Sequence, residues 1–163
     1  MLQQFKYNQL MSDLSWEKVG QSVVDVIGQL LDLDIAILHL QKLNYGVEQH
    51  FFYQKYTPQA TQIDHDLLKL TVVSCSELAF NDALTINQYE VNQAELPIDH
   101  YHVCLKVNIA SIVSIPLYLQ TNLCASLTIH QLNSSDRLEQ QQLAKLKILA
   151  TQANLILAQI LAG

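Results

Sequence analysis

Two apolar segments separated by three polar residues constrain the fold of this chain more than any other feature. Residues 112–119 and 123–130 are rich in apolar and β-branched side chains, and Gln120-Thr121-Asn122 lies between them. Such a short connection predicts that the two strands pair antiparallel as a hairpin. Pro116 lies inside the first strand, and because proline has no N–H, it requires a sheet edge or a β-bulge there.

The amino-terminal third of the chain predicts a helix followed by a second hairpin. From Ser15 to Leu31, apolar residues recur at the spacing of an amphipathic helix. Residues 35–40 and 47–53 have the composition of strands, and Asn44-Tyr45-Gly46 between them contains two residues that tolerate positive φ. We expect these two strands to be neighbours in the sheet.

The middle of the chain carries weaker patterns. Asp64 is placed to cap a helix that runs through Leu78. The centre of this predicted helix, Thr71-Val72-Val73, has low helix propensity. Residues 84–89 alternate in polarity like a short strand. Residues 90–102 have no clear period and contain Pro97, which indicates a loop with a short helix.

A long helix is predicted at the end of the chain. Asp136 and Glu139 form a capping pair ahead of a stretch without Pro or Gly that runs to Ala162, and this helix would be about 40 Å long. Two apolar stripes follow it, one of Leu146, Leu149, Ala153, Ile156 and Ile160 and one of Leu143, Ala150, Leu157 and Leu161. One sheet face cannot cover both stripes, which predicts a homodimer through the terminal helices. Alternatively, the first helix and residues 2–11 cover them.

The order of these elements predicts an α+β fold. Helix, two strands, helix, strand, loop, two strands and long helix fit an α/β/α sandwich with a central antiparallel sheet and long terminal helices. With 163 residues, 50% of them hydrophobic, the chain suits one domain with one core. We assign residues 1–14 to an N-terminal helical extension and residues 15–163 to the domain itself.

Composition excludes several classes of protein. The formal net charge is −6 and the nine basic residues are scattered, so nucleic acid and anionic membrane surfaces are poor partners. No apolar run approaches the ~18 residues of a transmembrane helix, and the start of the chain lacks the order of a signal peptide, so we expect a cytoplasmic protein. Cys75, Cys104 and Cys124 have no Cys-x-x-Cys spacing and are predicted to be reduced core residues.

The carboxyl-terminal third resembles the GAF domain. That family commonly shows a hydrophobic-Pro-hydrophobic step in a strand, a tight hairpin, another strand, a polar loop and a helix rich in Leu, Ala and Gln. The corresponding segments here are Ile115-Pro116-Leu117, Leu127-Thr128-Ile129-His130-Gln131, Asp136-Arg137-Leu138 and Leu149-Ala150-Thr151-Gln152-Ala153. They look most like the GAF domains of phytochromes and cyanobacteriochromes, and the resemblance extends over roughly Ser15 to Ala162.

In bilin-binding members of that group, a Cys-His pair on a short helix attaches and packs the tetrapyrrole. The matching pair in this chain is Asp99-His100, which keeps the histidine and lacks the thiol. A carboxylate cannot form the thioether, and Cys104 lies more than one helical turn further on. The resemblance therefore implies a GAF domain without the bilin-attachment cysteine, and the cofactor stays open, with a non-covalently held tetrapyrrole as a candidate.

The resemblance also implies the side chains of a ligand pocket. His100 and His130 match histidines that face the pocket in the family, and Asp99, Tyr101 and His102 lie in the same segment as His100. We expect these five residues to bind the ligand between the sheet and residues 90–102. The six histidines of the chain show no Glu-x-x-His or His-x-x-x-His spacing, so the sequence predicts no metal site.

The expected function is that of a sensory or regulatory domain in signal transduction, as in a two-component system. It would bind a small molecule or act as a dimerising module, with a signalling protein as a further partner, and it would not be an enzyme. One alternative is a non-covalent bilin photoreceptor. Another is a GAF-fold free methionine sulfoxide reductase, a class that also has three cysteines and needs accessible thiols of low pKa.

Overall fold

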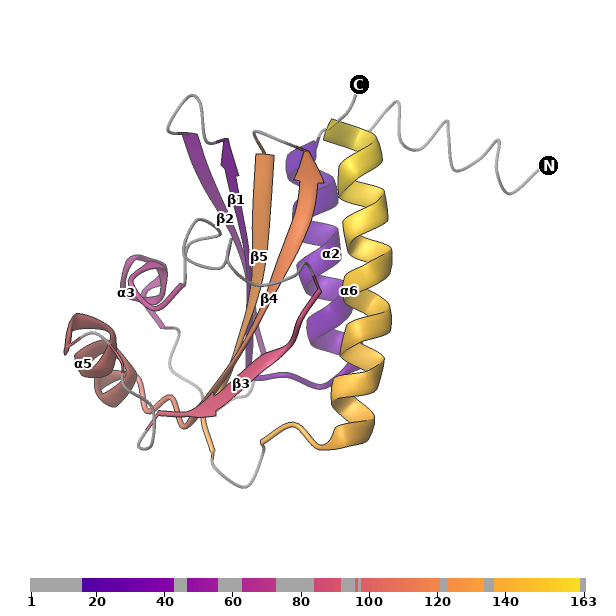
Figure 1. Ribbon diagram of the computed structural model, residues 1–163. Helices are drawn as coiled ribbons and strands as arrows, with labels where there is room; N and C mark the ends of the chain where they lie inside the picture. The colour runs from indigo at the N-terminus through magenta and orange to yellow at the C-terminus, as the bar shows by residue number, and fades with distance from the viewer. Residues whose placement is uncertain are drawn as a thin grey trace.

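A five-stranded antiparallel sheet with the order β2-β1-β5-β4-β3 forms the middle layer of the fold (Figure 1). The computed structural model describes residues 16–42, 47–55, 63–72, 84–91, 96, 98–120, 123–133 and 137–161. The strands are β1 (Ile35–Lys42), β2 (Val47–Gln54), β3 (Asn87–Glu90), β4 (Ser111–Gln120) and β5 (Leu123–Gln131). The predicted N-terminal extension, residues 1–14, lies outside the described residues.

Helices cover both faces of the sheet, which confirms the predicted α/β/α sandwich. The long helices α2 (Trp16–Leu30) and α6 (Gln140–Leu161) lie side by side on one face, and α3 (His65–Lys69) and α5 (Ile98–Lys106) lie on the other (Figure 1). Among the described residues, no helix is long and apolar enough to span a membrane.

Both predicted hairpins are present. β1 pairs with β2 and β4 with β5, and pairing of β1 with β5 joins the two hairpins into one sheet. Pro116 is tolerated in β4 because β3 pairs only with the first part of that strand, Ser111 to Ser114. Beyond it, the Pro116 carbonyl accepts a hydrogen bond from the backbone N–H of Leu84. The bulge in β4 lies further on, between Tyr118 and Gln120.

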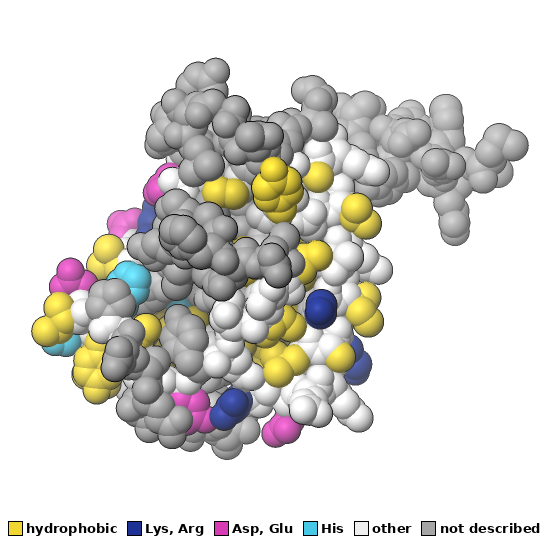
Figure 2. Space-filling model, in the orientation of Figure 1, with side chains coloured by type: hydrophobic (Ala, Val, Ile, Leu, Met, Phe, Trp, Pro, Cys, Tyr) yellow, Lys and Arg dark blue, Asp and Glu magenta, His cyan; other side chains and the backbone are white. Residues whose placement is uncertain are grey.

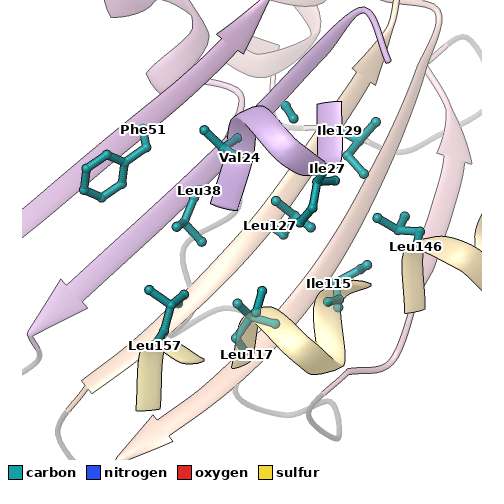
Figure 3. Close-up of a cluster of buried hydrophobic side chains, with 14 of the residues drawn as sticks. Val24, Ile27, Leu38, Phe51, Ile115, Leu117, Leu127, Ile129, Leu146 and Leu157 are labelled. Carbon is teal, nitrogen blue, oxygen red and sulfur yellow. The ribbon is translucent and has the colours of Figure 1, made fainter. Parts of the chain in front are cut away.

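The main core lies between the sheet and the pair α2 and α6. Alternation along the strands directs apolar side chains of β1, β4 and β5 to this face, where they meet the buried faces of both helices (Figure 3). Its central members are Val24, Ile27, Leu38, Ile115, Leu117, Leu127, Ile129, Leu146 and Leu157. Each such side chain contributes roughly 1.5–3 kcal/mol through its removal from water.

A smaller apolar cluster lies on the opposite face. It joins Ile35, Ile37 and Ile112 of the sheet to Leu68 of α3 and Cys104 of α5, all fully or almost fully buried. This cluster anchors the two short helices to one end of the sheet.

The terminal helix begins later than the sequence predicts. Residues 137–139 are not helical, so the predicted start after Asp136 is wrong. Glu139 takes the capping position, since its carbonyl accepts from the Leu143 N–H at 2.9 Å and its own N–H donates to the Gln142 side chain at 3.0 Å. Leu138 and Leu143 both join the main core, as in a hydrophobic staple, which favours this later start.

The middle of the chain differs most from the predictions. α3 has the predicted N-cap, Asp64, but ends at Lys69, so the helix predicted through Leu78 is wrong from residue 70 to 72. The hydroxyl of Thr71 donates to the Leu68 carbonyl, an alternative to continued helical bonding. β3 is shifted to Asn87–Glu90, and the short helix predicted within residues 90–102 extends to Lys106.

The two apolar stripes of the last helix form one broad contact face. Members of both stripes are buried or half-buried against the sheet and α2. The exposed apolar side chains of α6 are instead Ile148 and Leu155, at 59% and 60%, and those of α2 are Val26 and Leu30. Figure 2 shows hydrophobic side chains along the α6 side of the molecule, among polar and basic ones. A surplus apolar face therefore exists, although on other residues than the stripes.

Candidate functional site

Four buried polar side chains lie together on the sheet face opposite the main core, and we call them the polar floor. Ser126, Thr128 and His130 are the alternate residues of β5 that point to this face, and Ser114 of β4 lies directly opposite Thr128. None of the four is more than 1% exposed. On the other face of the same two strands, the corresponding positions are apolar and belong to the main core.

His130 is held by a contact with Thr71, the residue that follows the last turn of α3. The Thr71 Oγ1 atom lies 3.2 Å from Nε2 of His130 and also donates a hydrogen bond of 2.7 Å to the Leu68 carbonyl. A hydroxyl has only one hydrogen, so Thr71 must accept from His130. The ring proton is therefore on Nε2, and Nδ1 carries a bare lone pair.

Burial keeps this imidazole uncharged. Loss of hydration lowers the pKa of His130 to about 3, so the ring is neutral at physiological pH. The floor thus presents a hydrogen-bond acceptor at Nδ1 of His130 and two hydroxyl groups, which can donate or accept.

Three polar atoms of the floor have no hydrogen-bond partner. Ser114 Oγ, Thr128 Oγ1 and His130 Nδ1 are fully buried, and within the described part of the chain nothing satisfies them. An unpaired buried polar group costs about 1–3 kcal/mol, and such groups are rare in folded proteins. Three such atoms on adjacent strands make the polar floor the candidate site of the domain.

The cysteines near this face are unsuited to nucleophilic chemistry. Cys104 is free and fully buried, and desolvation raises the pKa of its thiol to about 11. Cys124 of β5 is disulfide-bonded, so the prediction of three reduced cysteines is wrong. Cys75 lies outside the described residues.

The structure separates the predicted site residues into two groups. His130 lies in the polar floor, whereas Asp99, Tyr101 and His102 are exposed on α5 and His100 is half-buried there. Figure 2 shows histidine side chains at the surface on the side of α3 and α5. α5 turns Val103 and Cys104 inward instead, whereas its other aliphatic residues, Ile98 and Leu105, are exposed. That Asp99, His100, Tyr101 and His102 contact a ligand stays a prediction.

Four residues of the site were not predicted from the sequence: Ser114, Ser126 and Thr128 of the floor, and Thr71. Ser114 and Thr128 lie in segments of overall apolar character, and the sequence predicts Thr71 in the interior of a helix. The available signal was the alternation itself, since Ser114 and Thr128 are polar at positions where a strand buried on both faces is normally apolar. Their position opposite each other follows only from the register of the hairpin.

An antiparallel sheet between two long helices and two short ones, with a buried polar floor on the side of the short helices, defines an α+β domain with the layers of an α/β/α sandwich. The GAF domain family model matches residues 15–157. This chain belongs to the GAF family.

Several solved structures with a similar fold are GAF domains of cyanobacterial phytochromes and cyanobacteriochromes. The GAF3 domain of Slr1393 from Synechocystis sp. PCC6803, in its photoproduct state, has 16% identity and a TM-score of 0.63, and the alignment covers 91% of this chain and 98% of that one. The phycocyanobilin-bound GAF domain of a cyanobacterial phytochrome has 13% identity and a TM-score of 0.66, with 94% and 90% covered.

A further similar structure is a domain of a putative two-component sensor histidine kinase from Sinorhizobium meliloti 1021. It has 14% identity and a TM-score of 0.66, with 92% of this chain and 95% of that chain covered. Among curated proteins, no sequence match was found. At these identities the structural likeness shows the fold alone.

Proposed function

We propose that this GAF domain is a sensor that binds a small molecule on the polar floor and acts by binding, without catalysis. The observation that carries the proposal is the set of three buried atoms without partners, Ser114 Oγ, Thr128 Oγ1 and His130 Nδ1. A ligand that supplies hydrogen bonds to them would recover the cost of their burial.

The chemistry of the floor selects the ligand. The four floor residues carry no charge at neutral pH, and His130 Nδ1 requires a donor from the ligand. The neighbouring cluster with Ile37, Ile112 and Cys104 is apolar. A largely apolar ligand with an N–H or O–H group fits this combination better than a phosphate ester, which needs cationic groups or helix N-terminal amides.

A non-covalently bound bilin is the more specific candidate. The pyrrole N–H groups of a tetrapyrrole would match the bare lone pair of His130, and the similar cyanobacterial phytochrome domain is a phycocyanobilin-bound one. Asp99 stands where the resemblance places the attachment cysteine, so this candidate requires binding without a thioether.

Signal output would use the opposite face of the same strands. Leu127 and Ile129 flank Thr128 on β5 and pack in the main core with α2 and α6. A ligand that shifts β5 would therefore act directly on the long helices, provided it binds one helix arrangement better than another. The exposed apolar residues Ile148 and Leu155 support a homodimer through these helices, and a signalling protein is a further partner.

The test is co-expression of the full chain with a bilin-producing pathway, followed by native mass spectrometry and absorption spectroscopy. We expect one added tetrapyrrole mass and a visible band, both lost on denaturation. The variants Ser114→Ala and Thr128→Val should weaken this binding. Ser111→Ala is the matched control, because Ser111 is also buried and without a partner in the described chain, but lies on the main-core face of β4.

Two results would contradict the proposal in different ways. If the protein retains a different small molecule and the same variants weaken its binding, the polar floor is a ligand site but the ligand is not a bilin. If titrations with bilins and with small-molecule mixtures detect no binding at all, the proposal that this domain is a small-molecule sensor is wrong.

A further inference from the structure

A second group of polar side chains lies on the same sheet face, at the β1–β2 edge. His39 of β1 is paired with His50 of β2, and Glu48 is two residues from His50 on the same side of the strand. One ligand atom from each of these residues lies within 4.8 Å of the others. Nε2 of His39 and Oε1 of Glu48 are 3.8 Å apart.

His39 is the least satisfied residue of this group. Only 2% of it is exposed, yet neither ring nitrogen has a hydrogen-bond partner in the described part of the chain. The 3.8 Å separation from Glu48 is too long for a hydrogen bond. A buried imidazole with both nitrogens unpaired requires a further partner, and a metal ion is a common one for histidine.

The other two residues provide access and charge. The Glu48 side chain is 48% exposed and His50 is half-buried, so an ion can reach the group from solvent along the sheet edge. Burial lowers the pKa of both imidazoles, for His50 to about 4, with smaller contributions from His39 and Lys69. Both rings are therefore neutral at pH 7, with lone pairs available without release of a proton.

We propose that His39, Glu48 and His50 bind a divalent transition-metal ion of the zinc class. Two histidines and one carboxylate form the donor set of open zinc sites, in which water or a ligand takes the fourth position. This inference goes beyond the proposed function and does not depend on it, although His39 lies beside floor residue Ser126 across β1 and β5.

Closure around the ion requires a small rearrangement. Ligand atoms about 2.0–2.1 Å from a tetrahedral zinc ion lie about 3.3 Å from one another, and since no separation in the group exceeds 4.8 Å, none must shorten by more than about 1.5 Å. The rings of His39 and His50 are stacked, with centroids 4.5 Å apart and an interplanar angle of 17°. One ring must tilt to aim its lone pair at the shared ion, and His50, on the edge strand, has the freedom to do so.

Among the described residues, Lys69 is a cationic group close enough to oppose a bound cation. Lys69 of α3 acts on His50 electrostatically, and it is paired with Asp66 at 3.5 Å. His65 continues the ring stack through Phe52, with centroids 4.1 Å apart, but is not part of the ligand group. Removal of the Lys69 charge should therefore tighten metal binding, whereas loss of His65 should not change it.

The test is isothermal titration of the metal-free full chain with Zn²⁺, with the bound metal counted by elemental analysis after dialysis. We expect one equivalent per chain. Glu48→Gln and His50→Ala should each weaken binding at least about tenfold, and Lys69→Ala should strengthen it. His65→Ala is the matched histidine control and should bind like the wild type. Glu48→Gln and His50→Ala change side chains with solvent access, so we expect both proteins to fold. They are preferred to His39→Ala, which changes a fully buried residue.

Cobalt(II) provides a readout of the coordination itself. The Co²⁺-loaded chain should show visible bands of tetrahedral coordination that Glu48→Gln alters and His65→Ala leaves unchanged. No binding at micromolar Zn²⁺, or binding that Glu48→Gln and His50→Ala leave intact, would overturn the proposal.

Discussion

The hydroxyl of Thr71 lies 3.2 Å from Nε2 of His130 and fixes which nitrogen of that buried ring carries the proton. Because the same hydroxyl donates to the Leu68 carbonyl, the contact ties the end of α3 to the middle layer of the fold. It also leaves the Nδ1 lone pair of His130 free for a ligand. A residue at the end of a one-turn helix thus sets the chemistry of the polar floor.

Thr71→Val removes the acceptor of this hydrogen bond while keeping the shape of the side chain. The N–H of His130 would then be buried without a partner, so we expect the free energy of unfolding to fall by about 1–3 kcal/mol. Urea denaturation measures this change. Thr151→Val is the control, since the Thr151 hydroxyl also donates to a backbone carbonyl but is exposed. An equal decrease in the free energy of unfolding for both variants would show that the hydrogen bond to His130 is not the cause.

Acid should destabilise the domain through its buried histidines. The pKa of His130 is lowered to about 3 and that of His50 to about 4, both below the ordinary value of 6.5. Between pH 6.5 and each lowered pKa, the histidine is protonated in the unfolded chain and neutral in the folded chain. The free energy of unfolding is therefore highest above pH 6.5 and falls as the pH decreases. The slope should approach about 1.4 kcal/mol per pH unit for each histidine.

Urea denaturation at a series of pH values from 7 to 4 tests this dependence. His130→Gln cannot take up the proton, so its stability should fall less steeply with acid than that of the wild type. An identical pH slope for the two proteins would contradict the assignment of a neutral, buried His130.

The strongly periodic parts of the chain could be predicted from sequence, and the residues brought together by strand register could not. The helix from Ser15 to Leu31 differs from α2 by one residue at each end, because its apolar spacing is unbroken. The start of α6 was misplaced because Asp136 with Glu139 and Glu139 with Gln142 both fit a capping pattern. Packing of Leu138 in the core favours the second arrangement, and packing cannot be deduced from one short motif.

The candidate sites show the same limit. His39 and His50 are far apart in sequence and fit no metal-binding motif, yet the β1–β2 register places them opposite each other. Ser114 and Thr128 meet in the same way across β4 and β5. A family resemblance singled out His130, and the structure places it in the polar floor. The resemblance singled out the histidines of α5 equally, and the structure places His102 in solvent, since Val103 and Cys104 take the inner face of that short helix.

Gly28 of α2 is required by the close approach of Tyr53. A Cβ atom at this position would overlap the Tyr53 ring, so Gly28→Ala must displace that side chain. We expect a loss of about 1–3 kcal/mol in the free energy of unfolding, despite the better helix propensity of alanine. Gln29→Ala, at the neighbouring exposed position, is the control and should be neutral or slightly stabilising. A stabilised Gly28→Ala protein in thermal denaturation would show that the ring moves freely.

Self-association through α6 can be tested with its two exposed apolar residues. Ile148 and Leu155 are seven residues apart, so they lie on one side of the helix two turns from each other. If this side pairs with a second copy, a glutamate there would bury a charge without a partner, and Ile148→Glu with Leu155→Glu should convert a dimer into a monomer. Light scattering coupled to size-exclusion chromatography gives the mass directly.

The control is Leu105→Glu, at a similarly exposed position of α5 on the opposite face of the sheet, and this variant should remain dimeric. A wild-type protein that is monomeric at micromolar concentration would refute pairing through α6, and the coupling of the floor to the long helices would then have to act within one chain.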